Sequence, residues 1–250
     1  MAGPIWLLVS TLSALACAMV LPRADNHTMI ASTCFDSQAD FDANFYYDYP
    51  WGNTHNGAAR MNSSQVSLDG GYLTLTAEYT IDQPAAGSLA INYLSGTVYG
   101  KEQYTVRVGG GYDFTAEFKA PTAKGTWPAF WLTAVQGWPP EIDIAEWKGD
   151  GEISFNTFNT SSEVTAHDVE YPDPDEWHEV KARLRPESDG TTLKIDFYLD
   201  GTMQMTQFGA EYVDKAFWFI IDLQMEGSDG SPGPTGSTFA MQEGRLMAVC

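Results

Sequence analysis

The chain has 250 residues and carries 13 lysines and arginines against 33 aspartates and glutamates, a formal net charge of -20. This charge argues against nucleic-acid binding, because a phosphate backbone is bound by a basic surface. Hydrophobic residues make up 44% of the chain and charged residues only 18%, which excludes a disordered protein. A chain of this length has room for one large domain with a substantial core.

The chain begins with an apolar run at residues 5–20, IWLLVSTLSALACAMV. The run is shorter than the ~20 residues that a membrane span needs, and the small residues around Ala16 and Ala18 suit cleavage by a signal peptidase. We therefore predict a signal peptide over residues 1–18, an N-terminal segment over 19–34 and one domain over 35–250. The mature protein is expected to be secreted, monomeric and without a membrane partner.

Cleavage after Ala18 would remove Cys17 and leave Cys34 and Cys250, one near each end of the mature chain. A single disulfide between these two residues is one expectation, and two reduced thiols are the other. Three sequons also agree with a secretory route and predict glycosylation. They begin at Asn26, Asn62 and Asn159.

Beyond the N-terminal segment, short β-rich runs alternate with clusters of Gly, Pro, Asp and Asn, and helical periodicity is almost absent. Apolar and polar residues alternate in the runs at 72–77, 112–119 and 193–199, as is typical of half-buried antiparallel strands. Residues 217–225 are more continuously apolar and predict a central strand that is covered on both faces or lines a cleft. Asp200-Gly201 predicts a hairpin turn. We expect an all-β fold of two antiparallel sheets packed as a sandwich.

The most informative stretch is EIDIAE at residues 141–146, with three carboxylates on a segment of strand propensity. In a regular strand Glu141 and Asp143 share a face and Glu146 points away. A β-bulge around residues 144 and 145 would return Glu146 to the carboxylate face, and bulges are over-represented beside active sites. A solvent-facing acidic strand is the alternative for the triplet alone.

Grouped carboxylates of this kind suit a retaining glycosidase. Its two carboxyl groups lie about 5 to 5.5 Å apart, and one attacks the anomeric carbon while the other protonates the leaving oxygen. Repulsion among three acids favours keeping one of them protonated near neutral pH, which supplies a general acid beside an ionised nucleophile. Asp143 would hydrogen-bond the nucleophile, but the spacing alone does not assign the roles of the two glutamates.

Tryptophans flank the acidic strand. An indole is flat and apolar with one polar N–H, so it suits stacking on a sugar ring. Trp131 and Trp138 lie within ten residues before the acidic strand and are predicted to contact the substrate, whereas Trp127, Trp177 and Trp218 are expected to pack in the core.

The loop WGNTHN at residues 51–56 is polar and aromatic. His55 and Asn56 in this loop are predicted to line the non-reducing half of a cleft. An ordinary surface loop is the alternative.

Three motifs occur in order, namely WPAFWL at 127–132, WPPEIDIAEW at 138–147 and FWFIIDLQMEG at 217–227. Together they resemble glycoside hydrolase family 16, in its laminarinase-like branch with a bulged E-x-D-x-x-E strand. The resemblance spans about residues 35–240. It implies a jelly-roll sandwich with a substrate cleft on its concave face and internal cleavage of β-linked polysaccharides with retention of configuration. It assigns the nucleophile to Glu141, the assisting carboxylate to Asp143 and the acid/base to Glu146.

The chain departs from the family pattern at several points. Glu117 stands where many relatives have an arginine, the segment at 155–158 lacks a histidine often found there, and residues 242–250 do not resemble the closing strand of the family. Relatives often bind a structural calcium ion on the convex face, although no loop here identifies its ligands. Catalysis by this family needs no cofactor.

We therefore expect a secreted, endo-acting, retaining glycoside hydrolase that cleaves a β-linked polysaccharide, namely a β-1,3-glucan or a β-1,3/1,4-glucan. One alternative is a hydrolase or transglycosylase of the same fold that acts on galactan or another wall polysaccharide. A second alternative is a carbohydrate-binding lectin that has lost turnover.

Overall fold

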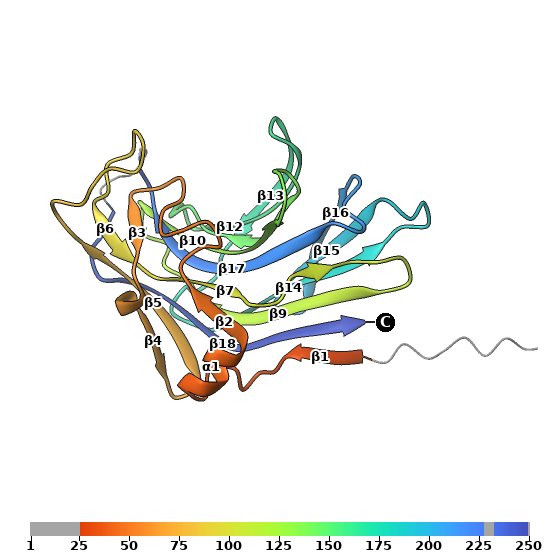
Figure 1. The fold of residues 1–250 in the computed structure, drawn as a ribbon, viewed down its shortest axis with the longest axis horizontal. Helices are drawn as coiled ribbons and strands as arrows, with labels where there is room; N and C mark the ends of the chain where they lie inside the picture. Colours follow the sequence, from red (N-terminus) through yellow and green to blue (C-terminus); the bar gives the residue numbers. More distant parts are fainter. Residues whose placement is uncertain (1–25, 228–232, 250) are drawn as a thin grey trace, which may run out of the picture.

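The computed structural model of the protein describes residues 26–227 and 233–249. Two sheets stack on one another, and the strands of each sheet are antiparallel except for one parallel pair, β3 with β6 (Figure 1). The predicted all-β jelly-roll sandwich is confirmed. No helix within these described residues is long and apolar enough to cross a membrane.

The first sheet carries the segment that contains the three carboxylates. Its strands, in spatial order, are β13 (Glu163–Glu170), β12 (Glu152–Thr160), β11 (Glu141–Glu146), β10 (Thr126–Ala134), β17 (Ala216–Met225), β7 (Thr97–Gly100) and β2 (Phe45–Tyr47), and β8 (Tyr104–Thr105) pairs with β17.

The second sheet packs behind the first. Its strands, in spatial order, are β16 (Thr202–Gly209), β15 (Leu193–Leu199), β14 (His178–Pro186), β9 (Gly111–Lys119), β18 (Ser237–Val249), β5 (Tyr72–Tyr79), β6 (Tyr93–Ser95) and β3 (Ala59–Met61). At its side, β1 (Asn26–Ile30) pairs with β18 and β4 (Val66–Asp69) pairs with β5.

The strands expected at 72–77, 112–119, 193–199 and 217–225 are confirmed as β5, β9, β15 and β17. The continuously apolar β17 lies inside the first sheet, between β10 and β7, as its composition predicts. The hairpin turn between β15 and β16 is also confirmed. Asp200 and Gly201 there have φ values of 49° and 72°, in the left-handed region that tight hairpin turns require.

One short helix, α1 (Gln38–Asn44), lies just before β2 and was not expected from the sequence. Its first turn is capped because the Ser37 hydroxyl accepts a hydrogen bond from the Asp40 amide at 3.1 Å. Only Phe41 of this helix is buried. A helix of 7 residues with one buried side chain shows no helical periodicity in the sequence. A single 3₁₀ turn, η1 (Ser63–Gln65), precedes β4.

Both ends of the fold differ from the sequence expectation. β1 lies before the predicted domain start at residue 35 but pairs with β18, and β18 continues as a strand through the closing residues up to Val249. The signal peptide predicted over residues 1–18 lies outside the described residues. Cys34 is buried, whereas its expected disulfide partner, Cys250, also lies outside them.

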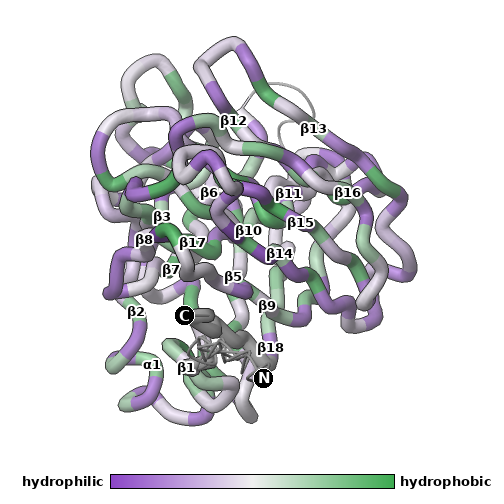
Figure 2. The backbone as a smooth tube through the Cα atoms, turned by 90° about the vertical axis from the view of Figure 1, so that its right-hand side faces the viewer, coloured by the Kyte–Doolittle hydropathy of each residue, from purple (hydrophilic) through white to green (hydrophobic). Residues whose placement is uncertain are grey.

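Aromatic rings fill much of the space between the sheets. Phe118 of β9 is fully buried; its ring stacks on Phe239 at 5.1 Å and contacts Phe130 of the facing sheet at 5.1 Å. Strand alternation directs these rings inward, and apolar and polar segments alternate along many strands in Figure 2. This core fixes the separation of the sheets and supports the strands that carry the carboxylates.

Replacing Phe118 by alanine is expected to lower the free energy of unfolding by about 3 to 5 kcal/mol, because it removes a buried ring that touches both sheets. Chemical denaturation measures this change. The matched control is Phe208→Ala on β16, whose side chain is 49% exposed and should cost less than about 1 kcal/mol. Equal losses in the two variants would contradict this description of the core.

Candidate active site

The bulge predicted in β11 is present. The pairing of β10 with β11 skips Ile144, and the pairing of β11 with β12 shifts between Asp143 and Glu146. The extra residue returns Glu146 to the face of the strand that carries Glu141 and Asp143. Ile144 itself is fully buried. The irregular strand therefore brings three carboxylates together on one face of the first sheet.

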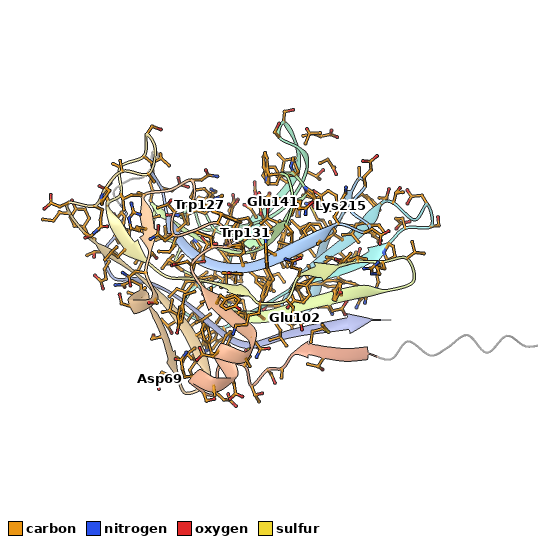
Figure 3. All side chains as sticks on the ribbon, in the orientation of Figure 1. Asp69, Glu102, Trp127, Trp131, Glu141 and Lys215 are labelled. Atoms are coloured by element: carbon orange, nitrogen blue, oxygen red, sulfur yellow. The ribbon has the colours of Figure 1, made fainter. Side chains whose placement is uncertain are left out.

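Two adjoining cavities, of about 340 and 460 Å³, lie over this face. All three carboxylates line the smaller cavity. The four residues predicted to contact the substrate, namely His55, Asn56, Trp131 and Trp138, line both cavities. Figure 3 shows Trp127, Trp131 and Glu141 close together on the upper side of the first sheet.

Glu146 is surrounded by hydrogen-bond donors and a cation. Trp127 donates its indole N–H to Oε1 at 2.6 Å, and Asn156 donates from Nδ2 to Oε2 at 3.2 Å. Lys148 Nζ lies 3.4 Å from Oε1 and also stands 3.2 Å from the centroid of the Trp127 ring. These groups fix the orientation of the Glu146 carboxyl group.

Glu141 and Asp143 lie in a less polar environment. Burial raises the pKa of Glu141 to about 7, although Trp138 donates its indole N–H to Oε2 at 2.9 Å and opposes the rise. Asp143 is almost completely buried, and burial together with repulsion from the two glutamates raises its pKa well above the usual range. Asn156 Nδ2 donates to Asp143 Oδ2 at 2.9 Å. The triplet therefore retains a proton near neutral pH, as its crowding predicts.

A wall of aromatic rings stands beside the carboxylates. The His55 ring stacks on Trp131 with centroids 5.5 Å apart, and Trp51 contacts Trp131 edge-on at 6.0 Å. Burial, with a smaller effect of Lys148, lowers the pKa of His55 to about 4, so this histidine is neutral near pH 7. The loop at 51–56 therefore presents flat, uncharged rings to the cavity.

Gln224 of β17 holds this loop in place. Its side-chain amide donates to the His55 carbonyl at 2.7 Å, and its Oε1 accepts from the Ala59 amide at 2.8 Å. Gly57 packs so closely on this side chain that a Cβ there would lie 2.5 Å from three Gln224 atoms. A glycine is therefore required where the loop crosses Gln224.

Comparison with known proteins agrees with this site. The family model described as Glycosyl hydrolases family 16 matches residues 56–215. The chain belongs to this family.

This family 16 enzyme is 47% identical over 232 residues to a galactan endo-beta-1,3-galactanase of Flammulina velutipes, covering 91% of this chain and 92% of that protein. An endo-1,3-1,4-beta-glycanase of Rhizobium meliloti (strain 1021) is 37% identical over 33% of this chain and 17% of its own length. The crystal structure of an endo-1,3-beta-glucanase from Streptomyces sioyaensis superposes with a TM-score of 0.68 at 21% identity, covering 83% of this chain and 90% of that one.

The family 16 chain is thus an O-glycosyl hydrolase of the endo-glycanase type, and a retaining mechanism is typical of the family. Its substrate is a polysaccharide. A lectin without turnover does not fit, because the carboxylate triplet is complete and grouped over a cavity.

The expectation that Trp127 packs in the core is wrong. In this family 16 enzyme Trp127 is half-buried and bonds Glu146, because residues 127 and 131 point to the same side of a regular strand. That alternation was readable in the sequence. Trp177 and Trp218 are half-buried too, and Trp177 stacks on Tyr72 with centroids 5.4 Å apart.

Sequence reasoning also missed Asn156 and Lys148. Asn156 lies in the segment at 155–158 that lacks the family histidine, and pairing with β11 places it opposite Asp143. Its amide group bridges Asp143 and Glu146. This bridge became visible only once the register between β11 and β12 was known.

Asp222 is a fourth carboxylate at the site. It is buried, its Oδ1 accepts from the Trp131 indole N–H at 2.7 Å, and its Oδ2 accepts from the Tyr49 hydroxyl at 2.9 Å. Burial raises its pKa to about 7, while these two hydrogen bonds oppose the rise. Asp222 therefore positions the Trp131 and Tyr49 rings from below.

Other predictions of ligands and modifications stay predictions. Over residues 26–227 and 233–249, no group of three or more His, Cys, Asp or Glu side chains could hold a metal ion, and a calcium site was expected only by resemblance. At the sequons, Asn62 is exposed. Asn159 is half-buried, and its side-chain amide bonds the backbone of Phe208 and Ala210, which leaves it poorly placed for a glycan.

Replacing Asp222 by asparagine is expected to change the pH dependence of stability of this family 16 enzyme. Because the folded-state pKa of Asp222 is raised from 3.8 to about 7, its ionisation destabilises the folded state, and the wild type loses stability as pH rises between these values. Asparagine cannot ionise, so the stability of the variant relative to wild type should increase over this range. Denaturant unfolding of both proteins at about pH 4 and about pH 8 measures the difference. Parallel pH profiles would contradict the raised pKa.

Proposed function

We propose that the protein is an endo-acting β-1,3-galactanase. The observation that carries the proposal is the 47% identity to the Flammulina velutipes galactan endo-beta-1,3-galactanase over nine-tenths of both chains. The sequence alone favoured a β-glucan and kept galactan as an alternative. The near-complete match reverses that order, because similarity to the Rhizobium meliloti endo-1,3-1,4-beta-glycanase extends over only a third of this chain.

The chemistry of the cleft is compatible with galactose. One face of a β-galactose ring presents the C–H groups at C3, C4 and C5, and this face stacks well on an aromatic ring. Trp131 and Trp138 line the cavity beside the carboxylates and provide such rings. A β-1,3-glucan or β-1,3/1,4-glucan is the second candidate, since glucose also stacks on indoles.

We assign the first chemical step to Glu141 and Glu146. An oxygen of ionised Glu141 attacks the anomeric carbon and forms a glycosyl ester, while Glu146 donates a proton to the oxygen of the departing sugar. Trp138 supports the ionised state of Glu141 by donating to Oε2. Asp143, with its raised pKa, carries a proton, which removes one negative charge next to Glu141.

The second step releases the sugar from Glu141. Glu146 takes a proton from a water molecule, whose oxygen attacks the anomeric carbon and displaces the Glu141 carboxylate. Two inversions at this carbon retain its configuration. Trp127 and Asn156 hold the Glu146 carboxylate in one orientation for both proton transfers. Attack by a sugar hydroxyl in place of water would give transglycosylation.

The remaining proposals concern the setting of the enzyme. We infer from the apolar N-terminal run that the protein is secreted, so that it meets its polysaccharide outside the cell. The net charge of -20 also fits a neutral polysaccharide better than an anionic one.

The purified protein is expected to release a mixture of short oligosaccharides from β-1,3-galactan and to act more slowly on laminarin and lichenan. Glu141→Gln should lower the rate at least ~10³-fold, or about 4 kcal/mol of barrier, because amide nitrogen and oxygen cannot form the glycosyl ester. Reducing-end assays and product chromatography measure both effects.

The matched control is Glu163→Gln, which changes an exposed glutamate of β13 outside the cavity and should leave the rate unchanged. Faster hydrolysis of laminarin than of galactan would show a glucanase instead. Undiminished turnover by a folded Glu141→Gln variant would refute the assigned roles.

A further inference from the structure

A second group of aromatic residues lies on the first sheet, away from the carboxylates. It consists of Tyr46 of β2, Tyr99 of β7 and Trp218 of β17, and we refer to it as the distal aromatic group. The rings of Tyr46 and Tyr99 are 5.4 Å apart, and those of Tyr99 and Trp218 are 5.6 Å apart. Tyr46 is 49% exposed, and the other two are half-buried. These rings are therefore accessible at the surface of the sheet.

Strand register places the distal aromatic group in line with the active site. Asp143 pairs with Trp131, and Trp131 pairs with Ile220. Ile220 in turn pairs with Tyr99, and Tyr99 with Tyr46. Residues directly opposite one another on antiparallel strands point to the same face of a sheet. One straight row across the strands thus joins a catalytic carboxylate to Tyr46.

Trp218 lies beside this row. It pairs with Thr133, which lines the larger cavity together with Glu141 and Trp131. The distal aromatic group therefore begins next to the cavity wall and extends over β17, β7 and β2, which follow one another in the sheet (Figure 1).

The dimensions suit a polysaccharide. Neighbouring strands are about 4.8 Å apart, so the three strand spacings from Trp131 to Tyr46 amount to about 14 Å. Several linked sugar rings can bridge this distance. A chain lying across the strands would pass the loop at 51–56, because Trp51 contacts Trp131 at the near end of the row.

The chemistry of the distal aromatic group also suits neutral sugars. Its flat rings can stack on the C–H faces of sugars, and their hydroxyl and indole N–H groups can bond sugar hydroxyls. Lys101 Nζ lies 4.5 Å from the centroid of the Tyr46 ring and donates to the Asp42 carbonyl. This contact holds the Tyr46 side chain against the sheet and reduces the entropy that binding would otherwise cost.

We propose that Tyr46, Tyr99 and Trp218 form a distal subsite that binds neutral sugar units of the same polysaccharide, several units from the bond that is cut, on the side of the loop at 51–56. The proposal rests on the proposed function only in that the cleft binds a polysaccharide. It implies that long substrates gain affinity which short ones cannot.

The test compares chain lengths. Tyr46→Ala should raise KM about fivefold for the polymer and for long oligosaccharides, because one stacking contact worth about 1 kcal/mol is lost. The kcat and KM for the shortest oligosaccharides that wild type cuts should stay unchanged. Trp218→Phe, which retains a ring in the half-buried position, should produce a smaller change in the same direction.

The matched control is Tyr72→Ala. Tyr72 is 40% exposed and also packs against one aromatic ring, but it belongs to β5 of the second sheet. The Tyr72→Ala substitution should leave KM unchanged for substrates of every chain length. Affinity electrophoresis in gels containing the polymer gives an independent measure of binding, in which Tyr46→Ala should migrate faster than wild type and Tyr72→Ala should not.

Two results would overturn the distal subsite. One is an unchanged KM of Tyr46→Ala for long substrates, and the other is an equal loss of activity on short and long substrates, which would mark Tyr46 as a structural residue. If wild type cuts laminarin rather than galactan, the same comparison is made with laminari-oligosaccharides. Failure of the galactan assignment is therefore distinguishable from failure of the distal subsite.

Discussion

Mutual repulsion among buried carboxylates is the constraint on which the site depends. A single extra residue in β11 places Glu141, Asp143 and Glu146 on one face, where three full negative charges would be strongly unfavourable. The surrounding residues reduce this repulsion in two ways. A proton stays on the triplet because burial raises the pKa values of Glu141 and Asp143, and the Trp138 indole N–H donates to Glu141 and stabilises its ionised form.

Indole donors link the catalytic strand to the aromatic cleft. Trp127 and Trp138 each donate to one of the two glutamates that we assign to the reaction, and each also lines a cavity, so one side chain serves both the carboxylate and the cavity wall. Asp222 on β17 is bonded in a similar way, because its carboxyl group accepts hydrogen bonds from the Trp131 indole N–H and the Tyr49 hydroxyl. The positions of the indole rings in the cleft are thus tied to the carboxylates of the site.

Much of this arrangement was predictable from the sequence. The alternation of apolar and polar residues predicts several of the strands. The odd spacing of Glu141 and Glu146 requires a bulge if all three carboxylates are to lie on one face of the strand. Trp131, Trp138, His55 and Asn56, which the sequence predicts to contact the substrate, line the two cavities, and the contact itself stays a prediction.

The missed features depend on register. The bridge from Asn156 depends on the shifted register between the consecutive strands β11 and β12. The row from Asp143 to Tyr46 arises from pairing between strands far apart in the chain, which local patterns do not encode. The helix α1 is too short to show a period. Trp127 faces the cavity and not the core because its position in β10 places it on the same side of the strand as Trp131. The E-x-D-x-x-E motif does not predict which sugar is bound, because the reaction assigned to its glutamates takes place at the anomeric carbon, which all the candidate sugars share.

The central claim, that Glu141 is the nucleophile of a double displacement, is tested most directly by trapping the intermediate. A 2-deoxy-2-fluoro galactoside with a good leaving group slows both steps but the second more, so the glycosyl ester accumulates. Peptide mass spectrometry of the inactivated enzyme should find the label on Glu141. A label on Glu146, or no label in an enzyme that inverts the anomeric centre, would contradict the assignment.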